Sequence, residues 1–397
     1  MHCDCAYFIN TYRHDWPTLA ALICPRPLLM LNSSDDRYYP PEGYTRVLDK
    51  VQRIYDAHGE VEKTGMFEVG GPHGYTQAQR EKAVEWSDRW LKGIESDIHE
   101  RPFEPIPGEQ LAAFNGDIPD DAINAEIQER LIPAKVLDRY TTLESWEKRK
   151  AEVMTDLTSV VFRNMPRSHT ALKTIPIDGD SFALETEPGI LVGMSSHFPG
   201  GEQAKQPALV YVASPGEDVD AIWNFLRSYP FQNDVTARYI VYPRGIGMAV
   251  WNGTETRRFE RSAMLLGRTV DEMRLHDILC AVDHVASQPW FGGENLTITG
   301  KGEQGILGAY AALLDKRISR IILHSPTVTH HSAPTFLNVL RYTDIPEVLG
   351  MLAPRELVFL TWEIYQFRAT RDLYSLYGAE DKVWRGQTVT QVLNRNR

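Results

Sequence analysis

The sequence predicts an α/β protein built on a doubly wound, mostly parallel sheet with helices on both faces. Short apolar runs of strand length alternate with helical segments along most of the chain, which is the pattern of parallel βαβ units. These runs are continuously apolar, as strands buried on both faces are. The 397 residues are 43% hydrophobic and 24% charged, an ordinary globular composition with enough length for two domains.

One motif occurs twice and organises the prediction. Pro25, Arg26, Leu28 and Leu31 recur 329 positions later as Pro354, Arg355, Leu357 and Leu360. In both copies a Pro-Arg turn leads into a short apolar run, because the residue before a proline avoids the helical conformation. Each copy is then followed by a polar stretch and by a helical segment rich in Tyr and Leu. We therefore expect two related units in one chain.

The first unit is expected to contain only the end of such a fold. Its elements are a strand, a helix, a strand and a helix, at residues 27–31, 43–58, 65–69 and 77–92. A capping box at Thr76 opens the last helix, and Gly93 ends it. We assign residues 1–93 to the C-terminal part of a first unit. Residues 94–125, rich in Pro, Asp and Glu, are expected to be a linker.

Residues 126–397 are expected to form a second and more complete domain. A helix is predicted at about 144–157, and a capping box at Thr269 opens another helix. Strands are predicted at 190–195, 208–213, 238–242, 296–299, 318–323 and 357–360. A glycine-rich turn at 300–305 joins one of these strands to a helix at 306–315.

Charge and cysteine content exclude several classes of protein. Acidic residues outnumber basic ones by 53 to 42, for a net charge of −11, which disfavours nucleic acid as a partner. No apolar run is long enough to span a membrane, and the N-terminus is not a secretory signal. The cluster His2-Cys3-Asp4-Cys5 lacks the second ligand pair of a zinc site, so no metal is expected. The protein is periplasmic or secreted if a signal peptide lies upstream, and otherwise cytoplasmic.

Asp36 and His73 are the candidate catalytic residues. Each follows a predicted strand of the first unit, and the carboxyl ends of parallel strands are where α/β sheets present ligands. An acid followed by a histidine on neighbouring strand ends matches the order Ser…Asp…His of the α/β-hydrolases. The histidine would act as general base, and the carboxylate would fix its tautomer. The alternative is that Asp36 caps a turn and His73 is an ordinary loop residue.

The serine that such a triad needs is absent from its expected position. No Gly-x-Ser-x-Gly pentapeptide occurs in the chain. The turn with the right context runs from Gly300 to Gly305, and its nucleophile position is Gly302, which has no side chain. Glu303 beside it is a candidate acid without an evident partner. A glycine-rich turn could instead bind a dinucleotide phosphate, but it lies late in its domain for that role.

The second copy also lacks the other two triad positions. The offset of 329 places Tyr365 opposite Asp36, and no histidine follows His330 and His331. Those two histidines are expected on a loop after a strand, where they could bind a ligand, although loop histidines usually just face water. Glu363 and Asp372 are expected on solvated faces.

Residues 2–13, 21–31, 32–40 and 71–73 resemble the C-terminal part of the acetyl xylan esterase-like and glucuronoyl esterase-like α/β-hydrolases. These are bacterial enzymes that act on esters of plant polysaccharides. The resemblance implies that Asp36 and His73 are the acid and the histidine of the family. It also implies that residues 180–360 correspond to a degenerate second hydrolase unit that some of these proteins carry in tandem.

The function expected from this resemblance is hydrolysis of carbohydrate esters by a Ser-His-Asp mechanism, with no metal or organic cofactor. The first unit's elbow would fall before residue 1, so Met1 is interpreted as a false or truncated start. The chain itself is expected to be nearly silent, and its incomplete first unit is expected to self-associate. One alternative is a non-catalytic module that binds glycan or protein through Trp251, Trp290 and Trp362. Another alternative is a circular permutation, in which Asp36 and His73 complete the active site of the second unit around Glu303.

Overall fold

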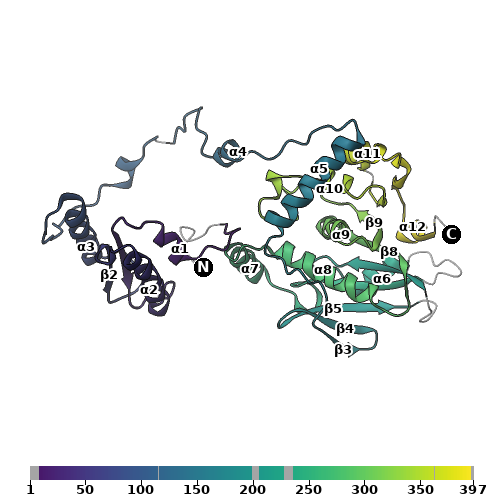
Figure 1. The fold of residues 1–397 in the computed structure, drawn as a ribbon, viewed down its shortest axis with the longest axis horizontal. Helices are drawn as coiled ribbons and strands as arrows, with labels where there is room; N and C mark the ends of the chain where they lie inside the picture. The colour runs from purple at the N-terminus through teal and green to yellow at the C-terminus, as the bar shows by residue number, and fades with distance from the viewer. Residues whose placement is uncertain (1–8, 115, 199–204, 228–235, 362, 395–397) are drawn as a thin grey trace. The chain divides into compact units, whose positions relative to one another are not determined.

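The computed structural model describes residues 9–114, 116–198, 205–227, 236–361 and 363–394, and the chain divides into two units (Figure 1). Unit 1 comprises residues 12–126. Unit 2 comprises residues 127–397 together with residues 9–11. Asn10 and Thr11 attach to unit 2 through backbone and side-chain hydrogen bonds, among them Asn10 N to Met264 O at 3.0 Å. This attachment was not predicted, because residues 1–93 were expected to form one unit.

Unit 1 is a small parallel sheet with helices on both faces. Its regular elements are α1 (Trp16–Ala21), β1 (Leu28–Ser33), α2 (Pro41–Ala57), β2 (Thr64–Val69) and α3 (Gln77–Ser87). The strand and helix order agrees with the prediction, including the Thr76 capping box and Gly93, whose φ of 69° ends the last helix. β1 and β2 are parallel along their whole length. Between residues 94 and 126, the described residues add only one short helical turn, Gly108–Leu111, and are mostly exposed.

The described residues of unit 2 form a nine-stranded sheet in the order β11-β10-β9-β8-β6-β7-β5-β4-β3. The six strands from β11 to β7 are parallel to their neighbours, and β5, β4 and β3 continue the sheet antiparallel. In chain order the strands are Lys173–Asp178, Ser181–Glu187, Ile190–His197, Gln206–Val212, Ala237–Tyr242, Phe291–Lys301, Ile318–His324, Glu356–Phe359 and Val383–Arg385. The expected doubly wound, mostly parallel sheet is therefore confirmed. The antiparallel β3–β4 hairpin was not predicted.

Helices cover both faces of this sheet. The helices in the described part of unit 2 are α4 (Ile127–Leu131), α5 (Leu143–Asp156), α6 (Val219–Arg227), α7 (Gly253–Leu265), α8 (Val270–Ala286), α9 (Gly302–Leu314), α10 (Ile345–Gly350), α11 (Arg368–Ser375) and α12 (Val389–Asn394), of which α4 does not pack on the sheet. Along β6, Val210 packs into the larger core with α8 and α9, while Leu209 and Tyr211 pack into the smaller core with α6 and α12. Alternate side chains of a strand point to opposite faces, so one fully apolar strand contributes to two cores.

The Pro-Arg repeat has the same local structure in both units. Leu28 pairs with Thr64 at the start of β1 and β2, and Leu357 pairs with Val383 at the start of β10 and β11. A buried tyrosine on the following helix donates its hydroxyl to the carbonyl of the arginine in each copy. The distances are 2.5 Å from Tyr55 to Arg26 and 2.9 Å from Tyr374 to Arg355. The repeated sequence therefore corresponds to a repeated structure.

Candidate functional site

The ends of β1 and β2 are tied together by their loops. Ser34 N donates to Val69 O at 2.9 Å, and Asp35 N donates to Gly71 O at 3.1 Å. Gly71 N in turn donates to the Asp35 carboxylate at 3.2 Å. Because the strands are parallel, their carboxyl ends lie at the same edge, and these bonds hold the two loops side by side.

Asp36 and His73 meet at this edge. His73 Nδ1 lies 2.7 Å from Asp36 Oδ2, and a carboxylate can only accept, so Nδ1 carries the proton. The other carboxylate oxygen accepts the backbone N–H groups of Tyr38 at 2.8 Å and Tyr39 at 3.3 Å. Burial alone would raise the pKa of Asp36, which is 8% exposed, but these hydrogen bonds hold it below its ordinary value. Asp36 is therefore a buried carboxylate oriented towards the imidazole.

The ring of His73 lies between two tyrosines and remains half exposed. The Tyr38 ring meets it edge-on at 5.3 Å and the Tyr39 ring is tilted at 5.9 Å, measured between ring centroids. With Nδ1 bonded to Asp36, Nε2 is the nitrogen left to accept a proton from a reacting group. No hydroxyl is hydrogen-bonded to His73 among the described residues. This arrangement supplies a base and its orienting acid without a nucleophile.

The turn from β8 to α9 in unit 2 has the conformation of a sharp strand-to-helix elbow. A Cβ on Gly300 would lie 2.9 Å from backbone atoms of Gln304 and Gly305, so the strand and helix approach too closely there for any side chain. Gly302 has a φ of 51°, the left-handed conformation in which this turn presents its residue to solvent. The elbow is thus formed, and the position at its tip is a glycine.

Side chains of unit 2 occupy the space beside this elbow. Lys301 Nζ forms an ion pair with Glu217 at 2.7 Å and lies 5.2 Å over the ring of Phe225. Glu217 also accepts the hydroxyl of Tyr211 at 2.9 Å and the backbone N–H of Ser214 at 2.8 Å. Glu217 therefore accepts hydrogen bonds from Tyr211 and Ser214 as well as the ion pair from Lys301.

Glu303 has a partner, contrary to the expectation from sequence. Its carboxyl group shares a hydrogen bond with Asp271 on α8, and Arg274 lies 3.9 Å away. Burial, and then the negative charge of Asp271, raise the pKa of Glu303 to about 8. Asp271 itself accepts the N–H of Thr335 at 2.7 Å and pairs with Arg274 at 3.2 Å. Glu303 is therefore half of a carboxyl–carboxylate pair at neutral pH.

The remaining candidates divide into buried and exposed residues. His330, expected to face water, is 7% exposed, with Nε2 at 2.7 Å from the Tyr310 hydroxyl and Nδ1 at 2.7 Å from Pro334 O. It is a satisfied core histidine, which corrects the expectation. His331, Glu363 and Asp372 are exposed, as expected. Tyr365, opposite Asp36 in the repeat, is 71% exposed and carries no carboxylate.

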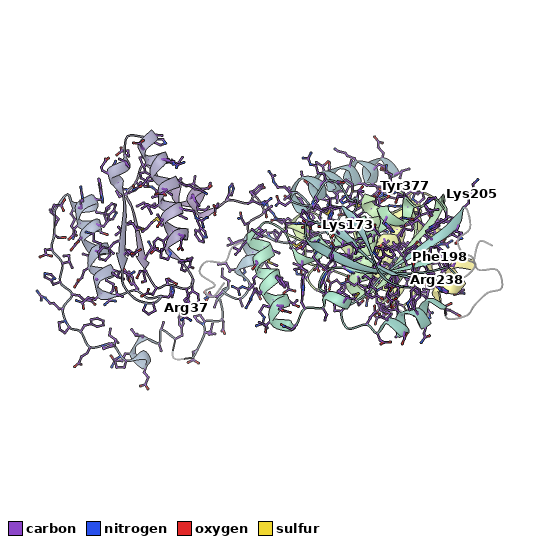
Figure 2. All side chains as sticks on the ribbon, turned by 90° about the horizontal axis from the view of Figure 1, so that it is seen from below. Arg37, Lys173, Phe198, Lys205, Arg238 and Tyr377 are labelled. Carbon is purple, nitrogen blue, oxygen red and sulfur yellow. The ribbon has the colours of Figure 1, made fainter. Side chains whose placement is uncertain are left out.

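The aromatic residues considered for ligand binding are mostly packed. Trp290 is 8% exposed, stacks on Tyr239 at 6.0 Å and meets Phe198 edge-on, so its assignment to an aromatic binding loop was wrong. Phe198 is labelled in Figure 2. Trp251 packs against Phe259 at 4.5 Å between ring centroids. Trp362 and the cluster His2 to Cys5 lie outside the described residues.

Two further findings concern metals and membranes. Within the described ranges, no group of three histidine, cysteine or acidic side chains is arranged to hold a metal ion. No helix in the same part of the chain is both long and apolar enough to cross a membrane.

Comparison with known proteins gives fold relatives only. No family model and no curated protein matches the sequence. A protein from Bacteroides fragilis assigned as an acetyl xylan esterase has a similar structure, with a TM-score of 0.54 and 12% identity over 69% of this chain and 84% of that one. A family 15 glucuronoyl esterase from Caldicellulosiruptor kristjansonii has a TM-score of 0.45 and 15% identity over 66% and 88%. The chain has the α/β-hydrolase fold, and the resemblance seen in its motifs is confirmed at the level of fold.

Proposed function

We propose that this chain is related to hydrolases of carbohydrate esters, and that Asp36 and His73 are the acid and base of a Ser-His-Asp triad. The observation that carries the proposal is the 2.7 Å contact between a buried carboxylate and the Nδ1 of a half-exposed histidine at the ends of two parallel strands. The substrate class is supported by the motif resemblance and by the name of the B. fragilis fold relative.

In the proposed chemistry a serine hydroxyl attacks the ester carbonyl while His73 Nε2 takes its proton. Asp36 holds the imidazole in the Nδ1–H tautomer and stabilises the imidazolium that forms. Collapse of the tetrahedral intermediate breaks the ester C–O bond, and His73 returns the proton to the departing sugar hydroxyl. A water molecule then hydrolyses the acyl-serine by the same proton transfers in reverse, which releases a carboxylic acid.

We further propose that these 397 residues lack the serine nucleophile of the triad. The elbow of unit 2 has Gly302 at its tip, and His73 bonds to no hydroxyl among the described residues. Without an acyl-enzyme, and without backbone N–H groups placed for an oxyanion, the base alone accelerates ester hydrolysis little. We therefore expect turnover close to that of buffer.

The test is ester turnover by the purified protein, with 4-nitrophenyl acetate and acetylated xylan as substrates. The wild-type chain and His73→Ala should be indistinguishable. A longer chain carrying a strand–elbow–helix segment with Gly-x-Ser-x-Gly before Met1 should be faster by at least about 10³-fold, and His73→Ala should abolish that gain. Turnover by the 397 residues that disappears in His73→Ala would show that a nucleophile is present after all. Equal rates in the short and long chains would show that Asp36 and His73 are not the site.

A second measurement checks the acid–base pair without any substrate. A proton held between His73 Nδ1 and the Asp36 carboxylate should give a strongly downfield proton resonance. Asp36→Asn should remove it, while Asp35→Asn should leave it in place. Retention of the resonance in Asp36→Asn would contradict the pairing.

The second candidate function is a non-catalytic binding module in unit 2. The observation that favours it is the occupied elbow, where Lys301 and Glu217 form an ion pair beside Gly302. Calorimetric titration with acetylated xylo-oligosaccharides tests it. Binding without turnover that is weakened by Lys301→Ala, and not by Lys316→Ala, supports the module, and the absence of binding rejects this ligand class.

A further inference from the structure

The loop that carries His73 depends on contacts at its two ends for its position. Residues 70–74, between β2 and α3, read Gly-Gly-Pro-His-Gly, and three glycines in five residues leave the backbone many conformations. The side chain of His73 is 49% exposed, so packing does not hold its outer side. A loop of this composition keeps Nδ1 at 2.7 Å from Asp36 only if other contacts fix it.

Gln79 fixes the end of this loop that leads into α3. The residue is 2% exposed. Its Oε1 accepts the backbone N–H of Thr76 at 2.7 Å, as the third residue of the capping box. Its Nε2 donates to the carbonyl of Asn32 in β1 at 3.1 Å. One buried amide thus joins the residue before α3 to the strand that leads to Asp36, although Gln79 and Asn32 are 47 positions apart.

The capping role alone does not require a glutamine at position 79. Glutamate and glutamine both serve as the third residue of a capping box, because the cap needs only an acceptor oxygen. In the capping box of α7, the Glu255 carboxylate accepts the N–H of Asn252 at 2.9 Å and makes no other hydrogen bond among the described residues. A carboxylate has no N–H group, so the bond to the Asn32 carbonyl needs the amide of Gln79.

Asp35 fixes the other end of the loop. Its backbone N–H donates to Gly71 O at 3.1 Å, and Gly71 N donates back to the Asp35 carboxylate at 3.2 Å. Gly71 has a φ of 115°, which a residue with a side chain rarely adopts, so the pair of bonds holds a specific turn. Asp35 is exposed, and water competes for its carboxylate, so this end is held less firmly than the buried end at Gln79.

We propose that Gln79 is a positioning residue for the base of the triad, and that Asp35 is its weaker counterpart at the other end of the loop. This inference rests on the proposed function of Asp36 and His73. Held at Gly71 and at Thr76, the loop keeps the imidazole in one orientation against the carboxylate before any substrate arrives. Such preorganisation is what a general base needs to act without a prior rearrangement of the loop.

The experiment follows the proton between His73 Nδ1 and Asp36 by its downfield resonance in the full 397-residue chain. Gln79→Glu keeps the size of the side chain and the acceptor of the capping box, but places a carboxylate oxygen against the Asn32 carbonyl. The exchange of this proton with water should accelerate at least about tenfold, because the loop opens more often once a buried bond is lost. Gln77→Glu makes the same charge change on the exposed face of α3 and should leave the exchange rate unchanged.

Two variants of Asp35 test the other end of the loop. Asp35→Ala removes the acceptor for Gly71 N and should accelerate the exchange about threefold, the smaller effect expected of an exposed bond. Asp35→Asn retains an acceptor oxygen and should restore the wild-type rate. A residue that only stabilised the fold would not give this rescue, because both variants remove the same charge.

The outcomes separate this inference from the function on which it rests. Absence of the resonance in the wild type, or its survival in Asp36→Asn, would contradict the pairing and overturn both. A resonance that depends on Asp36 but exchanges equally fast in the wild type, Gln79→Glu and Asp35→Ala would overturn the positioning role alone. Circular dichroism shows whether Gln79→Glu folds, and if it does not, the comparison of Asp35→Ala with Asp35→Asn decides.

Discussion

The two copies of the Pro-Arg repeat have the same local geometry and very different surroundings. Arg26 and Arg355 each donate Nε to the carbonyl three residues earlier, at 3.3 and 3.4 Å. Arg355 also donates Nη1 to Ala312 O at 2.5 Å and Ile318 O at 3.0 Å, where α9 ends and β9 begins. Arg26 is exposed and has no such carbonyls to bind among the described residues of unit 1.

The strands that follow show the same contrast. In β10, Leu357, Val358 and Phe359 are fully buried, because β9 and β11 flank the strand and helices cover both faces. In β1 the apolar run from Leu28 to Leu31 is only half buried. A short motif can thus specify its turn and its strand, while burial depends on neighbours that are remote in sequence.

The largest expected difference is the cost of truncating equivalent strand residues. Phe359→Ala should lower the free energy of unfolding of unit 2 by about 3–5 kcal/mol, because it leaves a cavity in a closed core. Met30→Ala at the equivalent position should cost unit 1 about 1 kcal/mol, because Met30 is half exposed. Denaturant titration followed by segment-resolved hydrogen exchange measures both. Equal costs would mean that β1 is as buried in solution as β10.

The arginine pair should differ next most strongly. Arg355→Ala removes a half-buried guanidinium that donates to carbonyls of two elements, and should cost about 2–3 kcal/mol. Arg26→Ala should cost less than about 0.5 kcal/mol, since exposed substitutions of this kind are nearly neutral. The same hydrogen-exchange experiment reads both variants. A large cost for Arg26→Ala would reveal a partner for its guanidinium that the described residues do not provide.

Glu303 in unit 2 and Asp36 in unit 1 should make the stabilities of the two units depend on pH in opposite directions. The pKa of Glu303 is raised to about 8, so the stability that its protonated form provides is present below its ordinary value of 4.5 and is lost as pH rises towards 8. The pKa of Asp36 is lowered, so its contribution is present at neutral pH and is lost as pH falls below its ordinary value of 3.8.

Glu303→Gln tests the first of these effects. At pH 9 it should raise the free energy of unfolding of unit 2 by about 2 kcal/mol, and at pH 5 it should change little. Glu363→Gln, which alters an exposed carboxylate, is the control and should be neutral at both pH values. A pH-independent effect of Glu303→Gln would show that the carboxyl pair with Asp271 does not form.

The contact between two residues at the ends of neighbouring parallel strands could be predicted from the sequence. Contacts that depend on how helices pack could not. Asp36 and His73 could be paired from sequence because parallel strands end at the same edge. Asp271 lies on a different helix from Glu303, so their contact depends on how α8 packs on α9. The burial of Trp290 likewise depends on Tyr239 of β7 and on Phe198 beyond β5, two segments far apart in the sequence.

The β3–β4 hairpin was missed for a physical reason. Pro176 argues against a strand, yet β3 lies at the sheet edge, where proline is tolerated because no neighbour needs its N–H. Gly179-Asp180 between the two strands is a two-residue hairpin signal, and Gly179 has the positive φ, 50°, that such turns require. That dipeptide could have identified the hairpin from sequence.

The smallest expected difference between the two copies of the repeat is at the buried tyrosines, where both copies should respond alike. Tyr55→Phe and Tyr374→Phe each remove one hydroxyl from a fully buried ring and leave an arginine carbonyl without its donor. Each should cost its own unit about 1–2 kcal/mol, the price of one unsatisfied buried acceptor. Because the bond lies inside the repeated turn, its cost should not depend on what covers the neighbouring strand. Tyr140→Phe, whose hydroxyl lies 3.5 Å from an exposed aspartate, should cost less than either. A cost at Tyr374 without one at Tyr55 would show that the turn of unit 1 is itself held by neighbours, and that the repeat alone does not specify it.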